Sequence, residues 1–139
     1  MPLITKQYKF CAAHRYWNSD WSDDKNKKIF DKDIFIHGHN YLLDITISGP
    51  INKDSGFIIN LKELNNLIKE KIIDLFDHSQ IEKDIKWFHS HQPSTENMVV
   101  FIWNQIADKI PTPAKLYSIK LQETPTIYTE YYGPQNERE

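Results

Sequence analysis

Two stretches of the chain, residues 3–14 and 37–48, alternate between apolar and polar side chains. Alternation is the pattern of half-buried β-strands, because successive side chains point to opposite faces of a sheet. One face of the first stretch carries Tyr8, Phe10, Ala12 and His14. One face of the second carries His37, His39, Tyr41, Leu43, Ile45 and Ile47. The sequence therefore predicts two strands, each with histidine at one end of an apolar face.

Two later stretches have apolar residues at helical spacing. The first predicts a helix over 61–76 with Asn60 as its N-cap. Its apolar positions are Leu61, Leu64, Ile68, Ile72 and Leu75. The second predicts a helix that begins at Ser94 or Thr95, either of which can act as the cap, and ends before Pro111. Its buried stripe consists of Val99, Ile102, Ile106 and Ile110.

The C-terminal part predicts two more strands. The third has Tyr117, Ile119, Leu121 and Glu123 on one face, and the fourth covers residues 126–132. The resulting order, β-β-α-α-β-β, is typical of an α+β domain with an antiparallel sheet and helices on one face. Residues 15–36 are polar, aromatic and irregular, and they predict a long loop. Long loops in small domains are usually functional, so we expect an active-site or interface insertion here.

Composition narrows the class of protein. The 139 residues predict one domain over 1–139, and 40% apolar and 13% aromatic content excludes a disordered chain. The balance of 17 basic and 19 acidic residues, without a basic block, argues against nucleic acid or an anionic membrane as the main partner. No apolar run is long enough for a transmembrane helix, and the N-terminal segment lacks the apolar core of a signal peptide. With a single cysteine, Cys11, the chain is expected to be cytoplasmic.

The pair His37 and His39 is the strongest chemical signal. A spacing of two places both imidazoles on one strand face, and Gly38 between them allows close approach of a ligand. If the first two strands are neighbours, His14 joins the pair, and three nitrogens with one open position match a catalytic zinc site. The alternative is three separate histidines that hydrogen-bond to backbone carbonyls or face solvent.

Several other ionisable residues have both a functional and a structural interpretation. Asp77 can orient the imidazole of His78 for acid–base chemistry, although a histidine at a helix C-terminus is also favoured by the helix dipole. Glu123 ends an apolar strand face, so either a ligand with paired N–H donors compensates its burial or it is the exposed end of a strand. Glu96, in a first helical turn, is explained by dipole compensation.

The remaining candidates predict structure rather than chemistry. Cys11 lies on the strand face opposite His14, which predicts a packed thiol rather than a nucleophile or a metal ligand. His89 and His91 precede the second helix and are read as loop histidines. The aromatic residues of 15–36 can form a lid, internal packing or subunit contacts.

Six short motifs occur in order between residue 10 and about residue 131. They are Phe10-Cys-Ala-Ala-His14, His37-Gly-His-Asn-Tyr41, Gly56-Phe-Ile-Ile-Asn60, Asp77-His78, Pro93-Ser-Thr-Glu-Asn97 and Gln122-Glu-Thr124. Each motif alone is weak, but in this order the chain resembles the 6-pyruvoyltetrahydropterin synthase family. That family includes the bacterial 6-carboxytetrahydropterin synthases of queuosine biosynthesis.

The resemblance implies the tunnelling fold (T-fold), in which β-β-α-α-β-β subunits join their antiparallel sheets into an oligomeric barrel. It also implies a homohexamer of two trimers, with active sites between subunits, a Zn²⁺ cofactor and a small-molecule pterin substrate. In the family, three histidines hold zinc, a glutamate and a nearby segment bind the pterin, and an Asp–His pair forms a relay behind a catalytic cysteine. The matching residues are His14, His37 and His39 for the metal, Glu123 with Thr95 and Glu96 for the pterin, and Asp77 and His78 for the relay.

The chain departs from the family at the catalytic cysteine. The family places this cysteine four or six residues before the first histidine of the HGH motif, where this chain has Asp33 and Asp31. An aspartate is already ionised at pH 7, so Asp33 is the expected replacement base and Asp31 the fallback. Asn60 is a milder departure, because the family commonly has aspartate there.

We therefore expect a zinc-dependent carbon–oxygen lyase acting on 7,8-dihydroneopterin triphosphate, of the 6-pyruvoyl or 6-carboxytetrahydropterin synthase type. The acidic replacement is expected to shift the product, towards side-chain cleavage to the folate precursor 6-hydroxymethyldihydropterin. Two alternatives remain open: a zinc- and pterin-binding homologue without turnover, and an unrelated zinc hydrolase.

Overall fold

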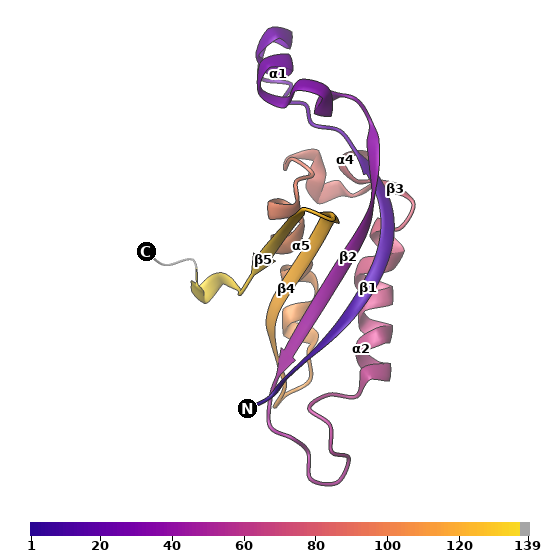
Figure 1. Ribbon diagram of the computed structural model, residues 1–139, viewed down its shortest axis with the longest axis vertical. Coiled ribbons are helices and arrows are strands. Elements are labelled where there is room, and N and C mark those ends of the chain that lie inside the picture. The colour runs from indigo at the N-terminus through magenta and orange to yellow at the C-terminus, as the bar shows by residue number, and fades with distance from the viewer. Residues whose placement is uncertain (137–139) are drawn as a thin grey trace.

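The computed structural model describes residues 1–136 and has a sheet with helices packed on one of its faces (Figure 1). The sheet has five strands in the order β3-β1-β2-β4-β5. These are β1 (Leu3–His14), β2 (His37–Ser48), β3 (Ser79–Gln80), β4 (Lys115–Thr124) and β5 (Ile127–Tyr131). Strand β3 pairs parallel with β1, and the other neighbours pair antiparallel. The predicted α+β class with an antiparallel sheet is confirmed.

Two long helical segments cover the sheet. Helix α2 (Leu61–Ile68) continues through a π-helical segment (Lys69–Ile73) into α3 (Asp74–Phe76). Helix α5 (Thr95–Ile106) continues into a 3₁₀ turn at Ala107–Lys109. The smaller elements are α1 (Asp23–Phe30), α4 (Ile81–Asp84) and 3₁₀ turns at Asp31–Ile34, Lys86–His89 and Pro134–Asn136. Within residues 1–136, none of the helices has the length and apolar character needed to cross a membrane.

The predicted caps form where the sequence indicated. Asn60 precedes α2, and its side chain accepts a hydrogen bond from the N–H of Lys62 at 2.9 Å. Ser94 rather than Thr95 caps α5, because the Ser94 hydroxyl accepts from the N–H of Asn97 at 3.2 Å. Each cap satisfies one backbone donor that the helix itself cannot pair.

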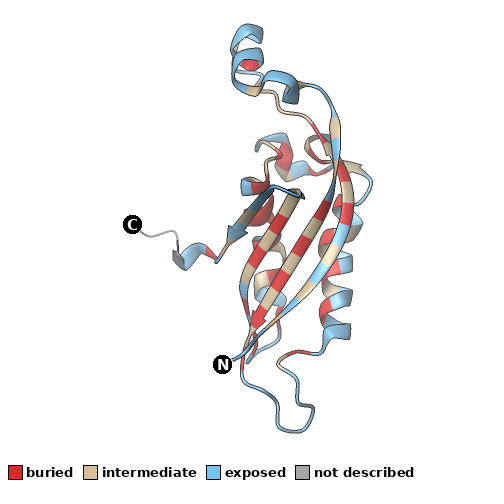
Figure 2. Cartoon of the chain, viewed as in Figure 1, coloured by how far each residue is buried: buried red, intermediate tan, exposed pale blue. Residues whose placement is uncertain are grey.

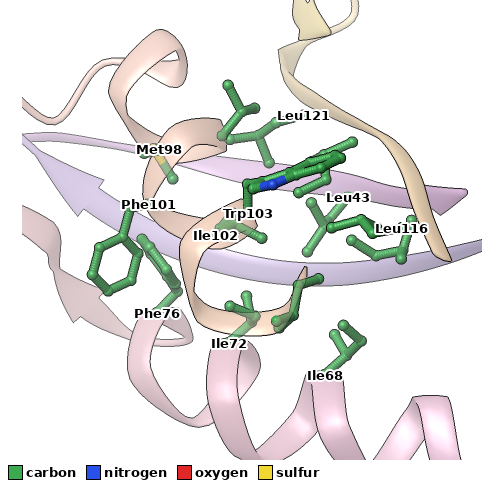
Figure 3. Close-up of a cluster of buried hydrophobic side chains, with 14 of the residues drawn as sticks. Leu43, Ile68, Ile72, Phe76, Met98, Phe101, Ile102, Trp103, Leu116 and Leu121 are labelled. Carbon is green, nitrogen blue, oxygen red and sulfur yellow. The ribbon is translucent and has the colours of Figure 1, made fainter. Parts of the chain in front are cut away.

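The hydrophobic core lies between the sheet and the helices. Alternating buried and partly exposed bands along β2 and β4 show that one sheet face is covered (Figure 2). The covered face of β2 packs against α2 and α5, with Trp103 and Phe101 of α5 beside Leu43 and Phe76 (Figure 3). The buried faces of β1 and β2 end at His14 and His39, so the core positions the predicted metal ligands.

The prediction of an irregular loop over 15–36 is wrong in part, because this segment contains α1. Ser22 caps the helix by accepting from the N–H of Lys25 at 3.1 Å. Its single buried residue is Asn26, which bonds to Asn18 and Ser22. Without an apolar stripe, α1 has no periodicity that a sequence pattern can detect. It forms an arm that projects from the sheet (Figure 1).

Two predicted core positions are exposed for identifiable reasons. Tyr117 is 44% exposed because a register shift pairs Thr46 with Ser118 but Ile47 with Leu116, which leaves Tyr117 in a β-bulge. Leu75 is 42% exposed, and Phe76 is buried in its place, because the π-helical segment adds a residue to the turn before it. Leu61, in the first turn of α2, is also exposed.

Candidate active site

Pairing of β1 with β2 brings the three predicted metal ligands together. His14 is the cross-strand partner of His37, and Ala12 is the partner of His39. The ring centroid of His14 lies 4.7 Å from that of His37 and 5.1 Å from that of His39. One nitrogen from each of the three rings lies within 4.8 Å of the others. The three imidazoles therefore converge as the strand alternation predicts.

Hydrogen bonds orient two of these rings. Nδ1 of His14 donates to the carbonyl of Pro93, and Nδ1 of His37 donates to the carbonyl of Phe35, each at 2.8 Å. Both bonds leave Nε2 with its lone pair available. Nε2 of His14 and of His39 are buried and have no hydrogen-bond partner among the described residues. A buried nitrogen without a partner lowers the stability of the fold unless a ligand binds to it.

The site favours neutral imidazoles. The pKa of His14 is lowered to about 4, mainly by burial and also by the two neighbouring histidines, against a raising effect of the Pro93 hydrogen bond. Burial, followed by His37, also lowers the pKa of His39. Neutral imidazole is the form that binds a metal ion. Three imidazole nitrogens, two of them unsatisfied, fit a zinc ion with a fourth position open to water or substrate.

A largely buried carboxylate lies beside this centre. Oε1 of Glu123 is 3.5 Å from Nε2 of His39, and the Glu123 side chain is 14% exposed. Burial raises the pKa of Glu123, with further raising effects of Asp33 and Glu96 and a lowering effect of His37. The interpretation of Glu123 as an exposed strand end does not hold.

The start of α5 contributes polar groups. The hydroxyl of Thr95 is buried, donates to Oε1 of Glu96 at 3.1 Å and lies 2.8 Å from the hydroxyl of Thr129. Glu96 and Glu123 interact electrostatically, so both predicted pterin contacts belong to one region.

The 3₁₀ turn that follows α1 carries a second carboxylate to the same region. Oδ1 of Asp33 lies 3.7 Å from Nε2 of His37, and the Asp33 side chain is 60% exposed. Asp31 instead occupies the C-cap of α1, where its backbone N–H donates to the carbonyl of Lys27. Of Asp31 and Asp33, Asp33 is the one beside a candidate metal ligand.

Tyr16 is a site residue that the sequence did not identify. Its ring centroid lies 5.1 Å from that of His14, and its N–H donates to the carbonyl of Asp33 at 2.8 Å. Burial, followed by Glu123, Glu96 and Asp33, raises the pKa of Tyr16, so its hydroxyl stays protonated. Nothing in the sequence distinguishes Tyr16 from the other aromatic residues of 15–36.

The predicted Asp77–His78 pair lies elsewhere on the chain. Oδ2 of Asp77 is 3.0 Å from Nδ1 of His78, directly after α3. The pair contacts Cys11, on the face of β1 opposite His14. The half-buried thiol was expected only to pack. Within one chain, the structure therefore separates the Asp–His pair from the three histidines.

His89 and His91 contribute to a different surface. They line a polar cavity of about 550 Å³ together with Arg15 and Glu82. The His91 ring stacks on Trp87 at 3.7 Å, and Nε2 of His89 lies 3.0 Å from the Lys83 carbonyl. Their interpretation as loop histidines agrees with these contacts.

Comparison with known sequences gives a consistent family. Residues 3–134 match the family model described as 6-pyruvoyl tetrahydropterin synthase. The chain is 36% identical to the 6-pyruvoyl tetrahydrobiopterin synthase of Drosophila melanogaster over 134 residues, covering 95% of this chain and 80% of that protein. It is 32% identical to the human protein of the same name, covering 94% and 90%. It is also 27% identical to a 6-carboxy-5,6,7,8-tetrahydropterin synthase of Rickettsia bellii, covering 94% and 99%.

Solved structures share the fold. The 6-pyruvoyl tetrahydropterin synthase of Caenorhabditis elegans superposes with a TM-score of 0.86 at 29% identity, covering 96% of this chain and 97% of that chain. The Plasmodium falciparum protein of this name, at 16% identity, has a TM-score of 0.66 and covers 95% and 97%. The predicted T-fold of the subunit is confirmed.

Proposed function

Because this chain belongs to the 6-pyruvoyl tetrahydropterin synthase family, we propose that it is a zinc-dependent enzyme acting on 7,8-dihydroneopterin triphosphate. The observation that carries this proposal is the convergence of His14, His37 and His39 with two buried, unsatisfied Nε2 atoms. A lone structural histidine cluster would not leave these nitrogens without partners.

Each side chain has a role that follows from its position. His14, His37 and His39 would hold zinc, which supplies Lewis-acid stabilisation of the substrate's side-chain oxygens. Glu123, largely buried, would accept paired N–H donors from the guanidine-like edge of the pterin. The buried Thr95 hydroxyl and Glu96 line the same region and would help to fix the ring.

Asp33 would act as the protein base. It lies beside His37 and is carried by an arm whose aromatic residues stack on one another: Tyr16 on Phe30, and Phe30 on Trp21. A carboxylate is ready to accept a carbon-bound proton at pH 7 but holds it weakly. We therefore expect slower chemistry than with a cysteine base, and a product shifted towards 6-hydroxymethyldihydropterin.

A structural neighbour supports a carboxylate in this role. The 6-pyruvoyltetrahydropterin synthase of Plasmodium vivax has a catalytic glutamate, which has been replaced by cysteine and by alanine in two solved structures. That protein is similar to this chain in fold at 16% identity, and its catalytic glutamate supports the proposal of an acidic base here.

The replacement of the cysteine also favours a second candidate function. A homologue that kept the zinc and pterin contacts but lost turnover would have the same three histidines and Glu123. Turnover separates the two candidates, whereas pterin binding is common to both.

We further propose a homohexamer in which each active site lies between subunits. The side of β1 that its short pairing with β3 leaves uncovered and the open edge of β5 can pair with neighbouring copies, and several apolar side chains near them are exposed. These are Leu3, Ile51, Phe57, Ile127 and Tyr128.

Metal content and pterin affinity test the site without requiring turnover. After zinc repletion and removal of free metal, wild type should hold about one zinc per chain, and His37→Ala should hold far less, with His91→Ala as the matched control. Glu123→Gln should weaken pterin binding at least roughly tenfold, whereas Glu63→Gln, an exposed position on α2, should not. Less than about half an equivalent of zinc in wild type, unchanged in His37→Ala, would contradict the proposal.

A further inference from the structure

A thiol, an imidazole and a carboxylate meet on the face of β1 away from the three histidines. Sγ of Cys11 lies 3.8 Å from both ring nitrogens of His78 and 3.7 Å from Oδ1 of Asp77. Nδ1 of His78 is 3.0 Å from Oδ2 of Asp77. The sulfur therefore contacts both the imidazole and the carboxylate, and these two groups also contact each other.

Backbone bonds hold this arrangement in place. The N–H of Cys11 donates to Oδ1 of Asp77 at 3.0 Å, and the N–H of His78 donates to the carbonyl of Cys11 at 2.6 Å. His78 adopts a φ of 64°, a conformation that non-glycine residues seldom take, and it turns the chain so that its ring faces the sulfur. The cluster is therefore fixed by main-chain contacts between β1 and the segment after α3.

The charges suit proton transfer from the thiol. The Cys11 N–H, followed by His78, lowers the pKa of Asp77, so this carboxylate is ionised at neutral pH. An ionised Asp77 orients Nδ1–H of His78 towards itself and leaves Nε2 as the acceptor. A carboxylate-oriented imidazole beside a thiol is the arrangement that activates a cysteine.

The thiol is also reachable. Cys11 lines an open groove of about 420 Å³ together with Gly38, Asn40 and His78, and a second groove on its other side with Lys9 and Leu42. The His78 side chain is 79% exposed, so its ring can turn while Asp77 holds its position.

We propose that Cys11, His78 and Asp77 form a thiol–imidazole–carboxylate relay, and that Cys11 supplies the thiol that this chain lacks ahead of His37. In the relay, the Sγ proton moves to Nε2 of His78, and Asp77 balances the imidazolium. The thiolate then takes a carbon-bound proton other than the one assigned to Asp33, the C–H electron pair stays on the substrate as an enolate, and His78 returns its proton to the substrate. The net change is an isomerisation without oxidation or reduction.

The location of the relay determines which site it serves. Because Cys11 and His14 lie on opposite faces of β1, the relay faces away from the three histidines of its own chain, and in the proposed homohexamer it would serve those of a neighbouring copy. This part rests on the proposed pterin function and its shared sites, whereas the activation of the thiol does not.

Alkylation tests the relay independently of substrate. Cys11 is the single cysteine, so one iodoacetamide adduct, followed by intact mass at pH 7 on the zinc-loaded protein, reports its rate without ambiguity. We expect wild type to react roughly tenfold or more faster than His78→Asn, since a free thiol is mostly protonated at this pH. Asparagine tolerates the positive φ, and His89→Asn, which changes a histidine of another loop, should react as wild type.

A second variant guards against a folding artefact. Asp77→Asn keeps the oxygen that accepts the Cys11 N–H, and it should also slow alkylation several-fold while retaining the native circular dichroism spectrum. Rates within about twofold of wild type in both variants would overturn the relay. So would a faster rate in His78→Asn, which would identify the cluster as a metal site that shields the thiol.

Turnover tests the second half of the proposal. With a pterin substrate that wild type converts, Cys11→Ser should lower kcat at least roughly tenfold with KM within about twofold, because the thiol acts on the reacting atoms. An activated thiol together with an unchanged kcat in Cys11→Ser would overturn the catalytic role. If wild type converts no pterin, the proposed function fails, and the alkylation rates still decide the relay.

Discussion

His14 is enclosed more tightly than the other candidate ligands, and its surroundings come from three parts of the chain. It ends the buried face of β1, its Nδ1 donates to Pro93 just before α5, and its ring contacts His37 of β2. Its unsatisfied Nε2 makes it the residue whose chemistry depends most on a bound metal.

We expect the metal-free protein to lose stability in mild acid because of this residue. The pKa of His14 falls from an ordinary 6.5 to about 4 on folding, so the unfolded chain binds its proton more tightly. The contribution of neutral His14 to the free energy of unfolding is therefore complete above pH 6.5, and it is lost progressively as pH falls towards 4. In urea unfolding of the chelator-treated protein, the free energy of unfolding should fall as the pH is lowered between these values. This dependence on pH should be weaker in His14→Gln. An equal slope in the variant would contradict the assignment.

Asp33 is the residue on which the type of reaction depends. With a pterin substrate, Asp33→Ala should lower kcat by roughly 10²-fold or more, the usual contribution of a general base. Asp33→Cys should change the product or the rate, because a thiol differs from a carboxylate in basicity. Steady-state kinetics with chromatographic separation of products measures both effects.

The matched control is Asp31→Ala, which removes the neighbouring carboxylate from the C-cap of α1. It should leave kcat within a few-fold of wild type. If Asp33→Ala keeps full activity and Asp33→Cys alters neither rate nor product, Asp33 is not the base.

The arm formed by α1 shows how an element can be stable without an apolar stripe. Asn26 is fully buried, accepts from the N–H of Asn18 at 2.7 Å, and donates to the carbonyls of Asn18 and Ser22. One amide thus fastens the segment before α1 to the helix that precedes Asp33. Polar contacts of this kind replace the core that a short projecting segment cannot form.

Replacing that amide should loosen the arm. Asn26→Ala leaves Asn18 and Ser22 groups unpaired and should lower the free energy of unfolding by about 1–3 kcal/mol, measured by urea denaturation. Asn66→Ala, at an exposed position of α2, should change it by less than about 0.5 kcal/mol. Equal effects of the two substitutions would show that the buried amide does not hold the arm.

The elements themselves were predictable to different degrees. Alternation over 3–14 and 37–48 predicted β1 and β2 with their observed bounds, because both strands bury one face. The bulge at Tyr117 and the π-helical segment before Phe76 were not predictable, since each changes the local residue count without changing composition. Helix α1 was missed because its stability comes from capping and Asn26.

The assembled site depended on contacts that no local pattern contains. The three histidines could be placed on one face from alternation alone, and Glu123 from its strand position. The position of Tyr16 depends on long-range packing of the arm. The contact of Cys11 with His78 depends on long-range packing of α3 against β1. Sequence therefore predicted the metal ligands but not the groups that surround them.

The whole molecule should be an assembly. Light scattering coupled to size exclusion should give a mass about six times the 16.5 kDa chain, since both sheet edges can pair with other copies. Ile127→Lys on β5 should reduce that mass, whereas Ile29→Lys on the exposed surface of α1 should not. A monomer or dimer for wild type at micromolar concentration would contradict the hexamer.

We propose that three histidines and a carboxylate base make this chain a pterin enzyme. Product analysis after incubation of zinc-loaded wild type with 7,8-dihydroneopterin triphosphate tests it most directly, with His37→Ala alongside. We predict that wild type converts the substrate to a new pterin, and that His37→Ala is slower by roughly 10²-fold or more. Unchanged substrate with wild type, or equal conversion by the variant, would contradict the claim.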